Sequence, residues 1–183
     1  MEKDLNVEQI YDGYDIPHKF RALLGYDKLL RCITKRKEII SIVSKLDSIS
    51  PECERHNATD MLLNTIDEDD YDLLIIAGHK HTWLNTVRAL NIAGYPKNRK
   101  ALPSLILLLQ DLNWPGAKEG MHVLKEAGKD AVIPLIAVAV EAGFSSNDFI
   151  WLAWIKEFLE FANIGKSDFN NHDVYDLLEH AEW

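Results

Sequence analysis

The sequence contains only two cysteines, Cys32 and Cys53, among its 183 residues. No CxxC pattern surrounds either one, and the single CxxH, from Cys53 to His56, has no second pair of ligands beside it, so a zinc site or a catalytic dithiol is not indicated. We expect two free, buried thiols, as in proteins of a reducing compartment. The sequence predicts no metal centre and no cofactor.

Long apolar runs are also missing. The longest, such as residues 149–155, are far shorter than the roughly 20 residues that cross a bilayer. Residues 1–4 are mostly charged and lead into no apolar segment, which argues against a signal peptide. We therefore expect a cytoplasmic protein that has no membrane partner.

Basic residues are outnumbered by acidic ones: 20 Lys and Arg stand against 29 Asp and Glu, for a formal net charge of −9. This charge repels the phosphates of nucleic acids and anionic membrane surfaces. A nucleic-acid binder would need a basic face, and only the short cluster at 97–100 offers one. The composition favours a basic protein as the partner and makes nucleic acid the weaker alternative.

Catalytic motifs are absent as well. The chain has no GxSxG, no phosphate-binding glycine loop and no HExxH, so no catalytic residue is identified. The one close histidine pair, His79 and His81, could share a face only in a strand, and a helix junction is the favoured interpretation. The acidic run 67–70 beside it lacks the glycine and the terminal glutamate of a calcium loop.

Helical periodicity dominates what the sequence does contain. Apolar residues recur at helical spacing over 27–46, and Asn57 or Thr59 could cap a short helix that follows. Residues 73–76 could form a buried strand, but the chain offers no second strand to pair with it. Further helices are expected at about 82–93, 100–110, 116–127, 130–142, 148–162 and 172–181. The sequence predicts an all-α fold.

An internal repeat indicates how these helices are arranged. Gly94 and Gly128 each follow a predicted helix and are 34 residues apart, while Pro103 and Pro134 fall early in the next helix and are 31 apart. Gly143 is expected to end a helix in the same way. A period of this length is typical of stacked helical hairpins, in which each pair buries its apolar face on its neighbours.

The segment 108–117 carries a more specific pattern, LQDLNWPGA after a leucine-rich helix. Together with the repeat it resembles a family of uncharacterised bacterial proteins with a HEAT-like helical domain, over roughly residues 82–160. The resemblance implies a HEAT-like α-α superhelix and no particular activity. We accordingly expect a HEAT-like repeat domain over 71–183 and a helical N-terminal extension, 1–70, that packs on the stack.

In physical terms the motif is a junction between helices. Pro115 suits the first helical position, and Asn113 or Asp111 could accept from nearby backbone N–H groups. Trp114 precedes a proline and is expected to be extended, so that its indole wedges between hairpins. The alternative is that Trp114 faces a ligand beside Asp111.

Charge is distributed unevenly along the chain. Lys97, Arg99 and Lys100 form a basic loop, whereas residues 141–183 contain nine acidic and two basic residues. Solvated surface explains both features most simply. The sharper hypothesis makes the acidic end a docking face for a basic partner, because complementary potentials speed and orient association.

The segment 149–161 is apolar nearly all round a helix. Either residues 168–183 cover this helix as an amphipathic lid, or it presents Trp151 and Trp154 at a contact surface. Coverage is the favoured interpretation.

These observations favour a non-enzymatic protein-interaction module, in its most concrete form an immunity or antitoxin-type inhibitor that covers a basic protein. The candidate binding residues are Asp111, Asn113, Trp114, Lys97, Arg99, Lys100, Trp151 and Trp154. The main alternative is an enzyme or ligand-binding protein, in which distant residues such as His79 and His81 converge on Asp111 and Trp114. A deep polar pocket lined by these four would indicate it.

Overall fold

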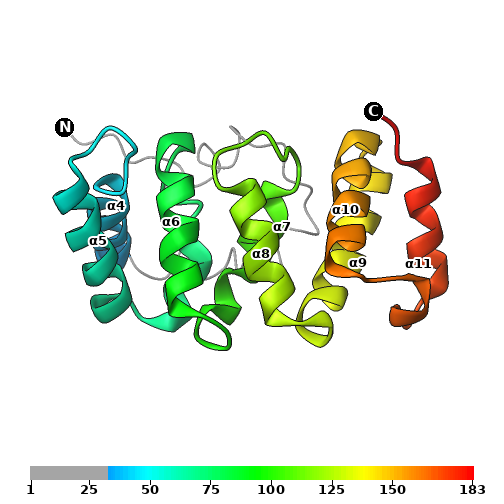
Figure 1. Ribbon diagram of the computed structural model, residues 1–183, viewed down its shortest axis with the longest axis horizontal. Helices are drawn as coiled ribbons and strands as arrows, with labels where there is room; N and C mark the ends of the chain where they lie inside the picture. Colours follow the sequence, from blue (N-terminus) through cyan, green and yellow to red (C-terminus); the bar gives the residue numbers. More distant parts are fainter. Residues whose placement is uncertain (1–32) are drawn as a thin grey trace.

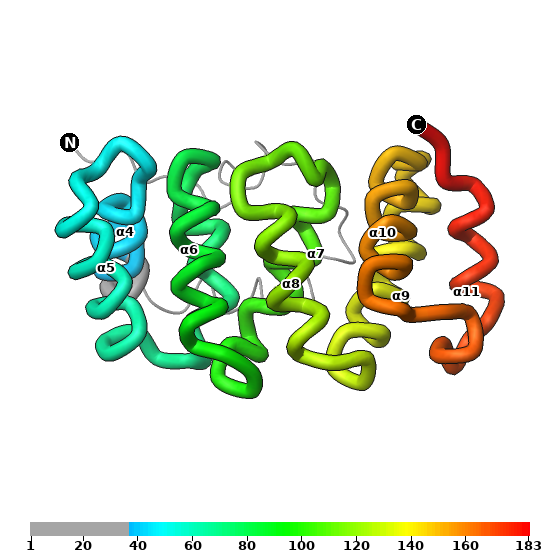
Figure 2. Tube along the Cα trace, in the orientation of Figure 1, coloured from blue at the N-terminus to red at the C-terminus, as the bar shows by residue number. Residues whose placement is uncertain are grey.

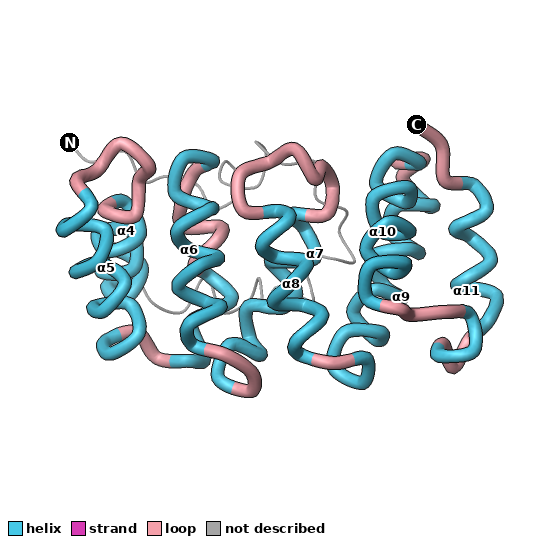
Figure 3. Tube along the Cα trace, in the orientation of Figure 1, coloured by secondary structure: helices cyan, strands magenta, loops and turns pink. Residues whose placement is uncertain are grey.

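The computed structural model describes the backbone of residues 33–183 and the side chains of residues 37–183. All regular structure in this range is helical, which confirms the all-α prediction (Figure 3). Residues 73–76, the one strand candidate, lie at the end of a 3-10 helix and in the turns that follow it. No helix among the described residues is long and apolar enough to cross a membrane.

The helices stack as hairpins in two rows (Figures 1 and 2). In Figure 1, α5, α6, α8 and α10 form the nearer row, α4, α7 and α9 lie behind them, and α11 closes one end. The elements in chain order are α4 (Ile33–Ser44), α5 (Glu52–Thr65), η1 (Glu68–Leu73), α6 (Lys80–Ala93), η2 (Lys97–Ala101), α7 (Leu102–Leu108), α8 (Ala117–Ala127), α9 (Lys129–Ser145), α10 (Phe149–Ala162), η3 (Lys166–Asp168), α11 (His172–Asp176) and η4 (Leu177–His180).

One apolar core runs between the rows. It extends without a break from Ile39 in α4 to Leu178 in η4, so every hairpin buries its face on the next one. Buried residues of α4 and α5 belong to the same core as those of α6 and α7. A boundary near residue 70 between an extension and a repeat domain stays a prediction. The part of the predicted extension before residue 33 lies outside the described residues.

The two copies of the sequence repeat are the hairpins α6–α7 and α8–α9. Gly94 and Gly128 end α6 and α8 with φ of +69° and +87°, as their positions predict. Pro103 lies in the first turn of α7, where the missing N–H is harmless. Pro134 lies deeper than expected, because α9 already begins at Lys129, and its ring faces solvent.

Some local expectations are wrong. The helix after the first loop begins at Glu52, directly behind Pro51, rather than at Asn57 or Thr59. Its exposed first turn carries Cys53, so this thiol is not buried. Cys32 lies outside the described residues.

Gly143 does not end a helix, since α9 continues to Ser145. Gly143 instead faces α10. A Cβ atom added to it would lie 2.9 Å from Cδ2 of Leu152 and 3.5 Å from Cε3 of Trp151, both in the core. The glycine therefore allows α9 and α10 to pack closely.

The junction between α7 and α8 also differs from its prediction. The helix α8 begins at Ala117, so Pro115 precedes it instead of occupying its first position. Between them Gly116 adopts φ +85°, which glycine reaches without strain. A Cβ atom at Gly116 would lie only 3.0 Å from Cα of Leu84, in the middle of α6. The start of α8 is therefore seated directly on the backbone of α6.

Two helical glycines provide a test of this packing. Gly120→Ala in α8 should raise the free energy of unfolding by about 0.5–1 kcal/mol, because alanine favours the helix and a Cβ atom there has room. Gly143→Ala should instead lower it by about 1 kcal/mol, because crowding of Leu152 outweighs the same helical gain. Urea unfolding of both variants measures the difference. An equal rise in both would show that α9 and α10 need no glycine between them.

Candidate binding surfaces

Asp111 and Asn113 build a turn at the end of α7. One carboxylate oxygen of Asp111 accepts hydrogen bonds from the backbone N–H of Asn113 at 2.8 Å and from its side-chain amide at 3.0 Å. The carboxylate thus accepts hydrogen bonds from within the loop rather than from the N–H groups at the start of α8. Both side chains are already engaged with each other.

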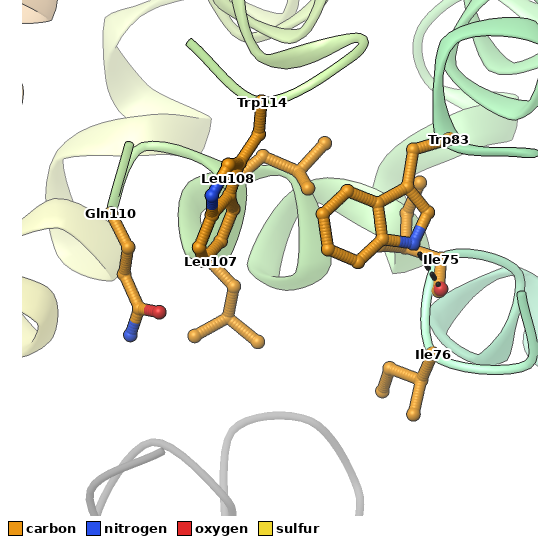
Figure 4. A pocket seen from close by; sticks show the side chains of 7 residues that line it. All are labelled: Ile75, Ile76, Trp83, Leu107, Leu108, Gln110 and Trp114. Carbon is orange, nitrogen blue, oxygen red and sulfur yellow. Dashed lines mark hydrogen bonds between the residues drawn. The ribbon is translucent and has the colours of Figure 1, made fainter. Parts of the chain in front are cut away.

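Trp114 packs as a wedge between this loop and α6. Its ring is half-buried and lies 5.4 Å, centroid to centroid, from Trp83, whose indole N–H donates to the carbonyl of Ile75 at 3.1 Å (Figure 4). The Lys80 ammonium lies 4.6 Å from the Trp114 ring centroid, a distance at which a cation is attracted to a ring face. The structure therefore places Trp114 in the joint between hairpins.

A narrow apolar slot opens between the two tryptophan rings (Figure 4). Its free volume is about 20 Å³, which is room for little more than one water molecule. The lining residues are Ile75, Ile76, Trp83, Leu107, Leu108, Gln110 and Trp114. Neither histidine nor Asp111 lines the slot, so it is not the polar pocket that an enzyme using these residues would need.

The histidine pair lies at a helix junction, as predicted. His79 immediately precedes α6, and its Nε2 lies 3.5 Å from a carboxylate oxygen of Asp47. The rings of His79 and His81 meet edge to face at 5.7 Å. In the part of the chain that the structure describes, no group of three His, Cys, Asp or Glu side chains is placed to hold a metal ion.

The basic loop lies against the acidic run that precedes it in sequence. The Lys97 ammonium donates to the backbone carbonyl of Leu63 at 3.2 Å, close to the end of α5, and the Lys100 ammonium lies 3.4 Å from the carboxylate of Asp69. Such a cation near a helix C-terminus is favourable. Two open hollows of about 530 and 460 Å³, lined mainly by polar and charged residues, lie beside this contact. Only Arg99 of the three predicted basic residues is exposed.

Sequence reasoning missed this contact although both charged segments were recognised. The two segments are separated by about 30 residues, and their meeting depends on how η1 and η2 stack. Their opposite charge was the available signal. The basic loop consequently connects η2 to η1 and to the end of α5, and it presents little free basic surface.

The C-terminal segment forms the predicted lid. Val174 of α11 and Leu178 of η4 are buried against α9 and α10, and the His180 ring lies 4.9 Å from that of Phe144. Trp151, proposed as a surface residue, is fully buried and belongs to the core. That assignment was wrong because this face of α10 packs on α9, where Gly143 lies against the Trp151 ring.

Trp154 is half-buried. It forms an exposed apolar patch together with Ile150 and Trp183. The Trp183 side chain is 76% exposed and its ring meets that of Trp154 edge to face at 4.5 Å. Ile150, 55% exposed, lies one helical turn before Trp154 on the same side of α10. The sequence predicted Trp154 here but not its two neighbours.

The same end of the stack keeps most of its negative charge. Asp168 pairs with Lys129 at 2.8 Å, Asp176 pairs with Lys166 at 2.6 Å, and Asp148 caps α10 by accepting from the N–H of Trp151. The remaining acidic residues form no ion pair within the described range. They are Glu141, Glu157, Glu160, Asp173, Glu179 and Glu182.

The two ion pairs shift the proton affinities of their members. The hydrogen bond from Lys129 lowers the pKa of Asp168, and the backbone N–H of Gly165 lowers it further. The hydrogen bond to Asp176 is the main cause of a raised pKa at Lys166. The first pair attaches η3 to α9, and the second holds η3 and α11 together.

No protein-family model, no curated protein and no solved structure matches this chain. The resemblance of the LQDLNWPGA segment to a bacterial HEAT-like family therefore stays a prediction.

Replacing the wedge tests its structural role. Trp114→Ala should lower the free energy of unfolding by about 2 kcal/mol, roughly half the cost at a fully buried aromatic, and should lower the melting temperature by several degrees. Trp183→Ala is the matched control and should leave the melting temperature nearly unchanged, because that ring is mostly exposed. Calorimetry measures both. A melting temperature of Trp114→Ala equal to wild type would place Trp114 on a binding surface instead.

The Asp168 pair predicts a pH dependence. Because the folded pKa of Asp168 lies below its ordinary value of about 3.9, its contribution to stability is complete above that value and disappears as the pH falls through the lowered pKa. Wild type should therefore melt at a higher temperature than Asp168→Asn at pH about 6, and the gap should close as the pH falls below about 4. A gap that is absent at neutral pH, or constant across this range, would contradict the pairing.

Proposed function

We propose that this chain is a non-enzymatic protein-interaction module, whose partner is a basic protein. The observation that supports this proposal is that basic and acidic side chains differ in how many have partners within the stack. Lys97 and Lys100 are occupied within the stack, whereas six acidic residues at the α10–α11 end have no ion pair within the described range. Such a predominantly negative surface steers a partner of opposite charge and disfavours others.

The remaining surfaces support the same proposal. A stack of helical hairpins offers an extended face to a partner, in contrast to an enzyme, which needs polar side chains converging in a pocket. The slot at Trp114 is apolar and small, and the charged hollows beside η1 and η2 are wide open. An immunity or antitoxin-type inhibitor, which covers a basic toxin domain, is the most concrete form of this proposal.

The two alternative functions receive less support. A ligand site at Asp111 and Trp114 would compete with the turn and the wedge that these side chains already form. Nucleic-acid binding would rest on Arg99, since the neighbouring lysines bond within the stack. Neither alternative has an observation that favours it over the interaction module.

Co-purification tests the proposal. The tagged full-length chain, expressed in its native cells, should recover one stoichiometric basic protein, identified by mass spectrometry. This protein should be released at about 0.5 M salt, where surface charges are screened over a few ångströms. Recovery of nothing above background, or of an acidic protein, would contradict the proposed function.

A pair of charge-matched variants locates the interaction. Glu157→Lys with Glu179→Lys reverses two charges at the acidic end and should reduce recovery of the basic protein at least about tenfold. Glu38→Lys with Glu126→Lys makes the same change in net charge on α4 and α8, and should retain recovery. Equal loss in both variants would mean that only the total charge of the chain matters.

A further inference from the structure

The apolar patch of Ile150, Trp154 and Trp183 forms one continuous surface. The two indole rings touch at 4.5 Å, and the backbone N–H of Glu182 donates to the carbonyl of Phe149 at 3.3 Å, which holds the last residues against the start of α10. Ile150 and Trp154 follow each other on one side of this helix. The patch therefore spans two segments that are fixed to each other.

Packing of the core gives no reason for these apolar side chains to be exposed. Single exposed apolar residues are common on protein surfaces, but tryptophan and isoleucine side by side are typical of the centres of interfaces. Trp183 is 76% exposed and Ile150 55%, while Trp151 on the same helix is fully buried. The stack thus buries the side of α10 that carries Trp151 and leaves Ile150 open.

Acidic residues surround the patch. Glu157 lies three residues beyond Trp154 and so neighbours it on the helix surface, and Glu182 directly precedes Trp183. Glu179 lies beside His180, whose ring stacks on Phe149 at 6.2 Å, and besides the hydrogen bond to Asp176 the charge of Glu179 also helps to raise the pKa of Lys166. All three carboxylates are on exposed residues and form no ion pair in the range that the structure describes. An apolar centre with a negative rim requires apolar anchors and positive charge from its partner.

The fold limits the form that the partner can take. A peptide that binds as an added strand needs a free strand edge, and residues 33–183 contain none. A helix satisfies its own backbone hydrogen bonds and can present apolar anchors on one side and lysine or arginine on the other. A second copy of this chain, or an anionic membrane, would be repelled by the acidic rim.

We infer that the Ile150–Trp154–Trp183 patch, with its rim of Glu157, Glu179 and Glu182, docks a basic amphipathic helix of a protein partner. The inference rests on the proposed function and deepens it, because it names the surface and the chemistry that the partner presents. Apolar side chains of the helix cover the patch, and its basic side chains meet the rim.

A synthetic peptide tests this surface without knowledge of the partner. The probe is a leucine–lysine peptide of about 18 residues, roughly five helical turns, with leucine at helical spacing. Calorimetric titration into the full-length chain should show one-to-one binding. Ile150→Ser with Trp183→Ser should weaken the affinity on the order of tenfold or more. Ile92→Ser is the control, because Ile92 is 66% exposed but lies on α6, and it should change the affinity less than about twofold.

Two further peptides separate the contributions of charge and apolar contact. A lysine–serine peptide of the same length lacks the anchors, and a glutamate–leucine peptide lacks the positive charge; both should bind on the order of tenfold more weakly than the probe. Equal binding of the lysine–serine peptide would overturn the apolar part of the inference. Equal binding of the glutamate–leucine peptide would overturn the charge part. No binding of the probe, or equal weakening in the Ile92→Ser control, would overturn the docking site as a whole.

The patch variants also separate this inference from the proposed function. If the Ile150→Ser with Trp183→Ser chain still recovers the basic protein from its native cells, the interaction module stands and this docking surface is wrong. If wild type recovers no basic protein, the proposed function itself fails, whichever peptide binds. Loss of the basic protein in the patch variant, with retention in Ile92→Ser, is the result that supports both.

Discussion

The stack depends most on the contact of Gly116 with the backbone of α6. Because a Cβ atom there would lie 3.0 Å from Cα of Leu84, only glycine allows α8 to begin at this distance. Backbone atoms of a helix cannot move aside as a flexible side chain can. The Trp114 wedge then fills the space beside the contact, against Trp83. Spacing between successive hairpins, and with it the continuity of the core, follows from these two features of one loop.

Charge is arranged around this core in a way that leaves one end unbalanced. Where η1 meets η2, an acidic run and a basic loop lie together, so Lys97 and Lys100 find their partners within the stack. Among the described residues, Lys129 and Lys166 are the cations that form ion pairs with carboxylates of the α10–α11 end. Solvent-exposed pairs of this kind add little stability, but they determine which charges remain for a partner. Residues 141–183, with nine acidic and two basic residues, contribute −7 to the formal net charge of −9.

How much of this could be predicted from sequence depends on whether the cause is local. Helices, and their ends at Gly94 and Gly128, follow from periodicity and from backbone freedom, which neighbouring residues reveal. The roles of Gly116 and Gly143 come from helices packed against them, and nothing in the nearby sequence identifies those helices. Of the candidate binding residues, Trp154 borders an exposed surface whereas Trp151 is buried against α9, and only the way in which α10 packs on the stack distinguishes them. Long-range packing was thus the missing information.

The open patch is a physical consequence of how the stack ends. A helix at the end of a solenoid needs a polar outer side or a cover, and α10 has Lys156, Glu157 and Glu160 exposed on its outer side, with Ile150 exposed beside them. α11 and η4 pack on α9 and α10 from one side. Trp151 is buried against α9, Ile150 stays open, and Trp183 lies against Trp154. Apolar area is thus left beside acidic side chains, which is the chemistry that a basic amphipathic helix would complement.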